Sequence, residues 1–264
     1  MQMLALYFSG TGNTKYIAEL FSRQMDATCF SIETVADFTS KIKSHDTITF
    51  CYPIYGSRVP RIMREFAIKY MAELTGKKLI IFAVQNFFSG DGARVFTDMF
   101  WEDSIDVIYA EHFNMPNNIN NTPFLRHASK WKIEKYKRKA ETKMNRVCSD
   151  ISQGIVKKCG FSRFSQWLGN IQGKVWQGNS KEVESSTGIE HRAKSGIKIH
   201  DGCTVCNLCV NICPMKNLTN RDGMITQLDN CTVCYRCINR CPQKAITVLF
   251  HRRPKWQYRG MEGD

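Results

Sequence analysis

Two cysteine runs in the last quarter of the chain have residue types and spacing suited to metal chemistry. One reads CTVCNLCVNICP from residue 203, and the other reads CTVCYRCINRCP from residue 231. Thiolates are soft ligands that suit iron and zinc. A zinc ribbon would show two separated CxxC pairs, and a disulfide framework would need an exported chain. We therefore predict eight metal ligands: Cys203, Cys206, Cys209, Cys213, Cys231, Cys234, Cys237 and Cys241.

This spacing resembles the C-x2-C-x2-C-x3-C-P run of bacterial two-cluster ferredoxins, over roughly residues 198–250. In that family one run holds three corners of a 4Fe-4S cubane, and the cysteine before proline in the other run holds the fourth. The resemblance implies two 4Fe-4S clusters with crossed ligands. One set would be Cys203, Cys206, Cys209 and Cys241, and the other Cys213, Cys231, Cys234 and Cys237.

An internal repeat supports two similar halves in this region. The stretch from Asp201 to Thr219 aligns without gaps to the stretch from Asp229 to Thr247. A duplication of this kind implies a pseudo-two-fold axis. Two short apolar runs, Met224–Leu228 and Ala245–Phe250, are candidate strands that we expect to pair across that axis.

A second site type is predicted by the first 21 residues, where an apolar strand is followed by a loop of glycines and hydroxyl residues and then by a helix. The expected strand is Met3–Phe8, and the helical pattern begins at Lys15. Backbone amides and a helix N-terminus together bind phosphate. The loop lacks both the GK[ST] of a Walker A motif and the third glycine of GxGxxG. Its residues are Ser9, Gly10, Thr11, Gly12, Asn13 and Thr14.

The loop resembles the phosphate loop of flavodoxins, SGTGNT at the end of the first strand. The resemblance implies that FMN is bound and that Ser9, Thr11, Asn13 and Thr14 contact its phosphate. The alternative is an ordinary strand–turn–helix unit with a glycine turn.

Strands and helices alternate to about residue 145, which is typical of a doubly wound α/β domain. We expect a five-stranded parallel sheet in the flavodoxin-like order 2-1-3-4-5, joined to a small α+β two-cluster ferredoxin domain. The further expected strands are Thr28–Ile32, Thr47–Tyr52, Lys78–Val84 and Asp106–Ala110.

Ligands of such sheets bind outside the carboxyl ends of the strands. We therefore expect the flavin ring to meet the loops after the third and fourth strands, and the fourth-strand loop resembles the second flavin loop of clostridial flavodoxins. The alternative for Tyr55 and Phe88 is packing within the loops. Three nearby arginines, Arg58, Arg61 and Arg64, predict a cationic rim or else a solvated helix face. The expected ring-binding residues are Pro53, Ile54, Tyr55, Gly56, Asn86, Phe87, Phe88, Gly90, Asp91 and Gly92.

The domain boundaries follow from these motifs. Residues 1–148 are expected to form the FMN-binding domain, residues 149–197 a linker docked in part through Trp167 and Trp176, and residues 198–264 the ferredoxin domain with a basic tail. We expect the asparagine-rich stretch within residues 111–129 to cover the flavin or the clusters, and the tail to pack over the ferredoxin lobe.

The formal net charge of +13 indicates an acidic partner. Two clusters and a flavin phosphate would lower this charge to about +7. We expect an acidic redox partner protein rather than nucleic acid, and the sequence leaves the oligomeric state open. Apolar stretches are too short for a membrane span, and an export signal is lacking, so a cytoplasmic location is expected.

The whole chain resembles the flavodoxin–ferredoxin fusion proteins of anaerobic bacteria and archaea. The resemblance implies an electron-transfer protein that relays low-potential electrons between clusters, FMN and a partner enzyme. Two alternatives stay open: an FMN-dependent reductase of a small molecule fed by its own clusters, and a nucleic-acid-binding or sensor protein. No catalytic residue is predicted, because no Ser/His/Asp constellation accompanies the flavin loops.

Overall fold

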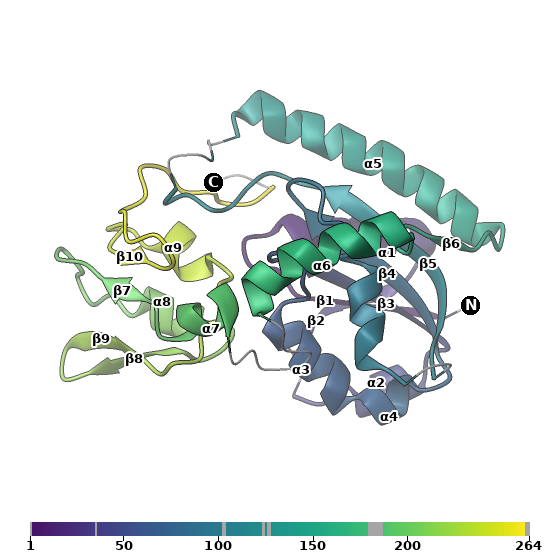
Figure 1. The fold of residues 1–264 in the computed structure, drawn as a ribbon, viewed down its shortest axis with the longest axis horizontal. Coiled ribbons are helices and arrows are strands. Elements are labelled where there is room, and N and C mark those ends of the chain that lie inside the picture. The colour runs from purple at the N-terminus through teal and green to yellow at the C-terminus, as the bar shows by residue number, and fades with distance from the viewer. Residues whose placement is uncertain are drawn as a thin grey trace.

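A parallel sheet with helices on both faces lies beside a smaller cysteine-rich lobe, which we define as residues 198–250, in the computed structural model (Figure 1). The structure describes residues 2–34, 36–101, 104–122, 125, 128–178 and 187–261. Most of the serine- and glutamate-rich stretch expected as linker, residues 179–186, lies outside these ranges.

The sheet has six parallel strands in the order β2-β1-β3-β4-β5-β6. The predicted order of the first five strands is confirmed. The sixth strand was missed: it is only two residues long and pairs through Tyr109 and Lys157 at the edge of β5. The bounds are β1 Met3–Tyr7, β2 Thr28–Ser31, β3 Thr47–Pro53, β4 Lys78–Gln85, β5 Asp106–Asn114 and β6 Lys157–Lys158.

Alternating side chains along the central strands fill a core on each face of the sheet. Leu79 and Ile81 of β4 face one core, and Ile80 and Phe82 face the other. One face is covered by α1 (Asn13–Met25) and α5 (Lys130–Ser152). The other is covered by α2 (Thr39–Lys43), α3 (Arg61–Lys69), α4 (Met71–Leu74) and the 3-10 helix η1 (Arg94–Met99). In the described residues, no helix is both long enough and apolar enough to cross a bilayer.

The segment expected to be a linker has more regular structure than its glycines suggest. It contains β6, α6 (Arg163–Gln177) and α7 (Gly188–Lys194). In Figure 1, α6 runs from the side of β6 toward α7 and the cysteine-rich lobe. Trp176, near the end of α6, is half-buried, whereas Trp167 is exposed.

The cysteine-rich lobe contains two short antiparallel pairs. β8 (Leu218–Arg221) pairs with β9 (Met224–Gln227), and β7 (Lys198–Ile199) pairs with β10 (Ile246–Thr247). The expected pairing between residues 224–228 and 245–250 is therefore wrong. The Asp222-Gly223 turn, with positive φ at both residues, folds β9 back on β8 instead. Two short helices complete the lobe, α8 (Leu208–Asn211) and α9 (Arg236–Arg240).

Candidate functional site

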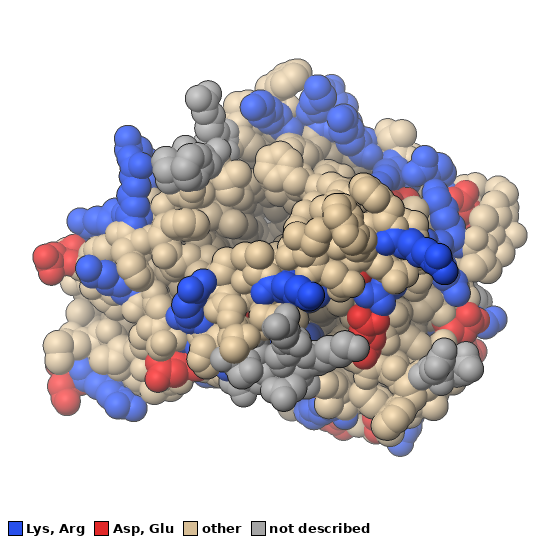
Figure 2. Space-filling model, in the orientation of Figure 1, with Lys and Arg blue, Asp and Glu red and all other residues tan. Residues whose placement is uncertain are grey.

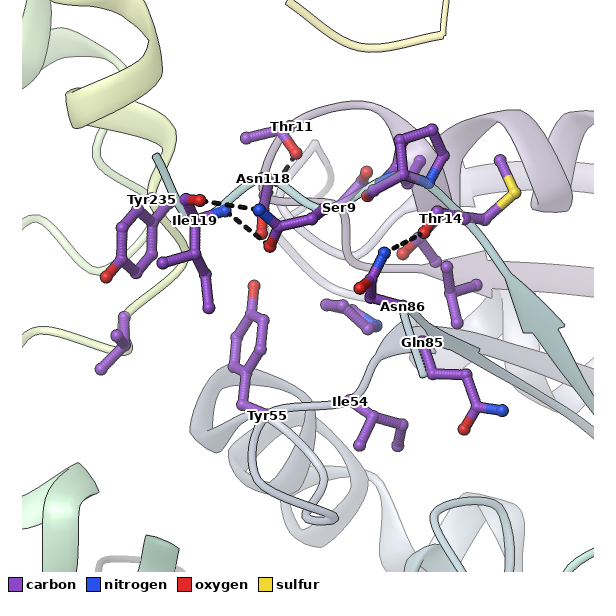
Figure 3. A pocket seen from close by; sticks show the side chains of 18 of the residues that line it. Ser9, Thr11, Thr14, Ile54, Tyr55, Gln85, Asn86, Asn118, Ile119 and Tyr235 are labelled. Carbon is purple, nitrogen blue, oxygen red and sulfur yellow. Dashed lines mark hydrogen bonds between the residues drawn. The ribbon is translucent and has the colours of Figure 1, made fainter. Parts of the chain in front are cut away.

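A cavity of about 730 Å³ free of protein atoms, part of it open to solvent, lies at the carboxyl ends of β1, β3 and β4 (Figure 3). This is the place where doubly wound sheets bind their ligands. Ten residues predicted from the sequence line it: Ser9, Gly10, Thr11, Asn13, Thr14, Pro53, Ile54, Tyr55, Gly56 and Asn86. Further residues complete the wall, five of them from the asparagine-rich stretch expected to lie near a cofactor: Val84, Gln85, Met115, Pro116, Asn117, Asn118, Ile119, Trp176, Val233, Tyr235 and Leu249.

The part of this cavity where the sequence predicts phosphate binding is the turn between β1 and α1. The Ser9 hydroxyl accepts a hydrogen bond from the Gly12 amide at 3.0 Å, which shapes the turn. α1 begins at Asn13, directly after the turn, and Thr14 is buried in its first turn. Hydroxyl groups and the positive end of α1 thus face the same space, which suits a phosphate monoester.

Two polar groups on the cavity wall lack a hydrogen-bond partner among the described residues. These buried atoms are the Tyr55 hydroxyl oxygen and the indole nitrogen of Trp176. Figure 3 shows Tyr55 rising from the loop after β3, with its hydroxyl toward the middle of the cavity. Burial, and then the nearby Cys234, raise the pKa of Tyr55 well above its usual value, so the phenol keeps its proton. Both groups are donors that a polar ring edge could satisfy.

Gly56 is needed where α6 meets this wall. Its φ is +53°, and an added Cβ would overlap the side chain of Trp176. Tyr55 and Trp176 have ring centroids 6.2 Å apart. The loop after β3 therefore both lines the cavity and holds the end of α6.

The asparagine-rich loop after β5 joins the two lobes at the cavity. Asn118 donates to the Thr11 hydroxyl at 3.2 Å and accepts from Asn239 of α9 at 2.9 Å. Asn121, which is 2% exposed, accepts from the Tyr235 hydroxyl at 3.0 Å. The amides thus satisfy polar groups of both lobes, and the loop lies over the phosphate turn.

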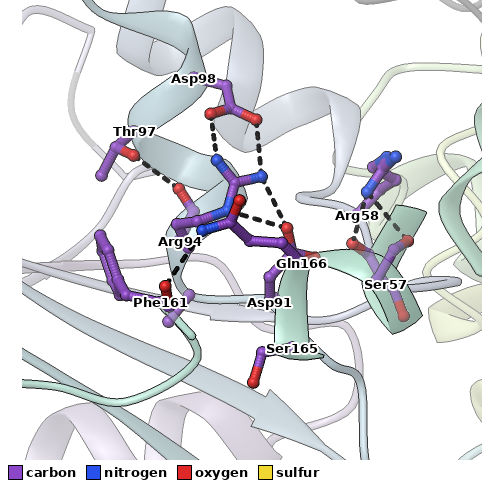
Figure 4. Close-up of polar contacts among 12 residues, drawn as sticks. Ser57, Arg58, Asp91, Arg94, Thr97, Asp98, Phe161, Ser165 and Gln166 are labelled. Carbon is purple, nitrogen blue, oxygen red and sulfur yellow. Dashed lines mark hydrogen bonds and ion pairs between the residues drawn. The ribbon is translucent and has the colours of Figure 1, made fainter. Parts of the chain in front are cut away.

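Most of the other predicted ring-binding loop lies elsewhere. Only Asn86 at its start lines the cavity, and the rest of the loop does not: Phe87, Phe88, Gly90, Asp91 and Gly92. Gly12 of the phosphate turn does not line it either. Asp91 is fully buried under α6 and pairs with Arg94 at 2.6 Å (Figure 4). Burial raises its pKa, and the Arg94 guanidinium opposes that shift. Phe87 and Phe88 are exposed.

The predicted cationic rim was wrong, because none of the three arginines lines the cavity. The alternative of a solvated helix face was wrong for Arg61 and Arg64, because both are buried. Arg61 is 2% exposed and donates to the Asn230 carbonyl oxygen at 2.8 Å. Arg64 forms a buried ion pair with Glu190 of α7 at 2.8 Å. Arg58 donates to the Gly169 carbonyl oxygen of α6 at 3.2 Å (Figure 4). These three side chains join α3 and the loop before it to α6, α7 and the cysteine-rich lobe.

Arg236 connects the cysteine-rich lobe to the phosphate loop. Its guanidinium donates to the carbonyl oxygens of Ser9 at 2.7 Å and Gly10 at 3.2 Å. The same group forms two 2.7 Å contacts with the Glu33 carboxylate. Burial lowers the pKa of Arg236, but the Glu33 carboxylate outweighs burial and raises it overall. Gly10 lies so close that an added Cβ would overlap the carbonyl oxygen of Cys234.

The cysteines gather around two small cavities. One is lined by Cys203, Cys206, Cys209 and Cys241. The other is lined by Cys213, Cys231, Cys234 and Cys237. Each set takes three cysteines from one run and one from the other, which is the grouping implied by the resemblance to two-cluster ferredoxins. What the two sets bind stays a prediction.

The backbone of the two runs repeats an unusual conformation. Val205 and Val233 have φ of 49° and 59°, and Asn207 and Tyr235 have φ of 61° and 60°. Positive φ is strained for a β-branched residue, so this conformation is unusual at valine. The repeated conformation accompanies the grouping of the cysteines of each run around one cavity.

Burial keeps the free thiols beside the second small cavity protonated. Burial, followed by the neighbouring cysteines, raises the pKa of Cys231 to about 12, and burial raises that of Cys234 to about 11. These thiols are protonated at neutral pH unless a cation lies beside them. Among the described residues, no three His, Cys, Asp or Glu side chains converge tightly enough for a single metal ion. None of the twelve cysteines forms a disulfide. The two four-cysteine sets therefore consist of free thiols, and the group that they hold stays a prediction.

The basic tail packs over both lobes, as expected for the cysteine-rich lobe, and reaches the phosphate loop as well. Gln257 donates to the Cys241 carbonyl oxygen at 2.7 Å. Tyr258 is buried, and its hydroxyl donates to the Asn13 side chain at 2.5 Å. The segment around residue 258 is thus part of the support of the phosphate turn.

The second cysteine run adds residues that sequence reasoning missed. Val233 and Tyr235 line the sheet cavity, and Tyr235 also lines the cavity of the second cysteine set. The repeat contains a signal for this, because Tyr235-Arg236 stands where the first run has Asn207-Leu208. Only the second half of the repeat has an aromatic and a basic residue at these positions, and this is the half that packs against the sheet domain.

The sheet and its topology define a doubly wound α/β domain, and the hydroxyl-rich turn after β1 lies where such domains bind their ligands. Residues 4–145 match the flavodoxin domain family, and the chain belongs to that family. No curated protein matches the chain.

Several solved structures are similar to parts of the chain. A flavodoxin from the domain Archaea is 16% identical with a TM-score of 0.38, covering 56% of this chain and 99% of that one. The two-electron reduced flavodoxin of Megasphaera elsdenii is 21% identical with a TM-score of 0.39, covering 55% and 99%. A flavoprotein in complex with FMN from Lactobacillus acidophilus NCFM is 14% identical with a TM-score of 0.34, covering 42% and 92%.

Proposed function

We propose that this protein is an electron-transfer flavoprotein with FMN in the sheet cavity and two 4Fe-4S clusters in the cysteine-rich lobe. It relays low-potential electrons among these groups and on to a partner redox enzyme. Membership of the flavodoxin domain family supports a flavin-based redox role. The observation that carries the relay is the position of Tyr235, which lines both the sheet cavity and the second four-cysteine cavity.

The residues around the sheet cavity are suited to bind and orient FMN. The turn of Ser9, Thr11 and Thr14 would hold the phosphate at the positive end of α1. The unpartnered donors of Tyr55 and Trp176 would meet the polar edge of the ring. When bound, the flavin exchanges one or two electrons, whereas a cluster exchanges one.

The order of the two clusters follows from burial. Cys231, Cys234 and Cys237 belong to the loop that touches Gly10 and the cavity wall, and Cys234 packs into the core of the sheet domain. In the first run, Cys206 is exposed. The set with Cys213 would thus hold the cluster next to the flavin, and the set with Cys241 the outer cluster that meets an external donor or acceptor.

Cofactor content tests the proposal directly. Anaerobically purified protein should contain two 4Fe-4S clusters and one FMN per chain. Cys213→Ala should damage the inner cluster and spare the outer one, and Cys241→Ala should do the reverse, because each serves the other run. Cys159→Ala, which changes a half-buried cysteine outside both sets, is the matched control. Electron paramagnetic resonance of the reduced protein distinguishes the two clusters.

Zinc in place of iron would contradict the proposal. So would a result in which each variant loses the cluster of the run that contains the substituted cysteine.

Electron transfer between the modules is a second readout. After rapid anaerobic reduction of the clusters, flavin absorbance should change at a rate independent of protein concentration, because both groups share one chain. A rate that rises with protein concentration would mean two separate carriers. Turnover of an added small acceptor without a protein partner would favour the reductase alternative.

A further inference from the structure

A groove beside the cofactor cavity has no role in the function proposed above. It lies between α5 and the carboxyl ends of β4 and β5. We call it the lysine groove because three of its lining residues are exposed lysines. Its residues used below are Asn86, Phe87, Trp131, Lys132, Lys135 and Lys139. Figure 2 shows basic side chains gathered along the upper edge of the molecule, over α5.

Three lysines of this groove form a row of exposed ammonium groups on α5. Lys132, Lys135 and Lys139 are exposed and follow one another at helical spacing on the groove side of α5. The row extends over about 10 Å. Within the described parts of the chain, none of the three has a carboxylate at ion-pair distance. By contrast, Lys143 at the end of the groove is held by Glu111 at 3.1 Å.

Large apolar rings lie among these charges. Phe87 is 71% exposed and Trp131 is 62% exposed. The Lys135 ammonium lies 5.1 Å from the centre of the Trp131 ring. Exposed aromatic residues surrounded by charge are typical of the anchor positions of protein–protein interfaces.

The groove adjoins the cofactor cavity. Asn86 lines both, and its side-chain amide donates to the Met115 carbonyl oxygen at 3.0 Å in the wall between them. A macromolecule seated in the groove would therefore lie beside the flavin site without entering it.

We propose that the lysine groove docks an acidic redox protein. A row of separate ammonium groups matches carboxylates spread along a protein surface, whereas a single phosphate would need cations converging on one point. The two rings would bury apolar side chains of the partner at the centre of the contact. The redox character of the partner rests on the proposed function, while its acidity and apolar contact rest on the groove alone.

Charge reversal in the groove tests this inference. The probe is a fluorophore-labelled small acidic ferredoxin, and its dissociation constant is measured by fluorescence anisotropy at several salt concentrations. In the triple variant Lys132→Glu, Lys135→Glu and Lys139→Glu, the dissociation constant should rise by about 10-fold or more at low salt. The matched control is Lys43→Glu, Lys69→Glu and Lys78→Glu, three exposed lysines at the opposite ends of the strands. The control should change binding by less than about 2-fold.

The apolar part of the surface has its own test. Phe87→Ala with Trp131→Ala should weaken binding of the same probe even at high salt, where charge attraction is screened. Circular dichroism and FMN content of each variant show whether the fold and the cofactor site are retained.

Three outcomes would overturn the inference: no binding of the acidic probe by the wild-type protein, equal weakening in groove and control variants, or tighter groove-dependent binding of a 20-nucleotide single-stranded RNA. The last outcome would assign the groove to nucleic acid. Each is independent of cofactor analysis, so a protein with full FMN and iron content that fails to bind the probe refutes the groove alone. A protein that binds the probe but contains no cofactor refutes the proposed function alone.

Discussion

Single side chains connect the two lobes, and Arg236 is one that contacts the phosphate turn directly. It reaches the Ser9 and Gly10 carbonyl oxygens, the Ile212 carbonyl oxygen and the Glu33 carboxylate. The guanidinium also lies 5.9 Å from the centre of the Phe8 ring. Its planar shape allows contacts in several directions at once, which an ammonium group could not make.

Arg236→Gln should loosen the contact between the lobes. Glu33 would lose its cation and the loop carbonyls their donors, so we expect the free energy of unfolding to fall by about 2–3 kcal/mol. FMN should also bind more weakly, because the phosphate turn loses its support. Thermal unfolding and FMN titration measure these effects. Arg240→Gln, an exposed position on the same helix, is the control. Equal effects of the two substitutions would contradict the prediction.

His112 makes stability sensitive to mild acid. Burial lowers its pKa from 6.5 to about 4, despite the nearby Glu111. Its Nε2 accepts a hydrogen bond from the Ala93 amide at 3.2 Å, which requires the neutral ring. In the unfolded chain the ring takes up a proton below about pH 6.5. Stability is therefore full above that pH and falls by up to about 3 kcal/mol as pH drops to about 4.

His112→Gln retains an acceptor for the Ala93 amide and removes the titration. Urea unfolding at pH 7.5, 5.5 and 4.5 should give a shallower loss of stability in the variant than in the wild type. The Lys143 ammonium and the Glu111 carboxylate face this ring and are common to both proteins. Parallel pH profiles would mean that another group controls the acid response.

At the scale of secondary-structure elements, α6 depends on two glycines. A Cβ on Gly169 would overlap the buried Asp91 carboxylate, and a Cβ on Gly173 would overlap the Arg58 guanidinium. The helix can lie on the loop after β4 only because both positions lack side chains. Trp176, at the end of the same helix, then reaches the cofactor cavity.

Gly169→Ala should destabilise the protein, although alanine gains about 1 kcal/mol over glycine in an ordinary helix. Asp91 is short, fully buried and held by Arg94, so it has no room to move. Gly173→Ala meets only the end of a long arginine side chain and should cost less. Melting temperatures and FMN affinity compare the two. A higher melting temperature for Gly169→Ala would show that α6 does not rest on Asp91.

The elements that sequence reasoning placed correctly are those with local signals. Apolar runs predict the central strands, and the hydroxyl-rich turn predicts its own position at the end of β1. The loop of Phe87–Gly92 resembles a flavin loop in composition, yet α6 sits on it. No local pattern indicates this, because the helix is interrupted by glycines and its partner lies about 80 residues earlier. The wall residues Val233 and Tyr235 were missed although the repeat differs at Tyr235-Arg236, because that difference does not show which part of the sheet domain they contact.

At the scale of the whole molecule, the cavity belongs to neither lobe alone. The sheet supplies the phosphate turn and Tyr55, whereas α6 and the cysteine-rich lobe supply Trp176 and Tyr235. The buried pair of Arg64 and Glu190 joins the sheet domain to α7. We therefore expect the two lobes to unfold together in the complete chain.

A fragment of residues 1–153 should fold, because β1 to β5 and both layers of helices are present. It should bind FMN about 10-fold or more weakly than the complete chain, since Trp176, Val233 and Tyr235 are missing. Flavin fluorescence quenching measures the affinity, and circular dichroism checks the fold. Equal affinity of the folded fragment and the complete chain would show that the second lobe adds nothing to the site.

The contact between Tyr258 and Asn13 has a consequence for biosynthesis. Asn13 emerges early in translation, and its partner is made 245 residues later. At about 5–20 residues per second, the turn waits roughly 12–50 s for that support. Until then the nascent chain exposes an anion-binding loop with an incomplete wall. We therefore expect FMN to bind weakly until the last residues of the chain are made, and a chain truncated before Tyr258 to bind it poorly.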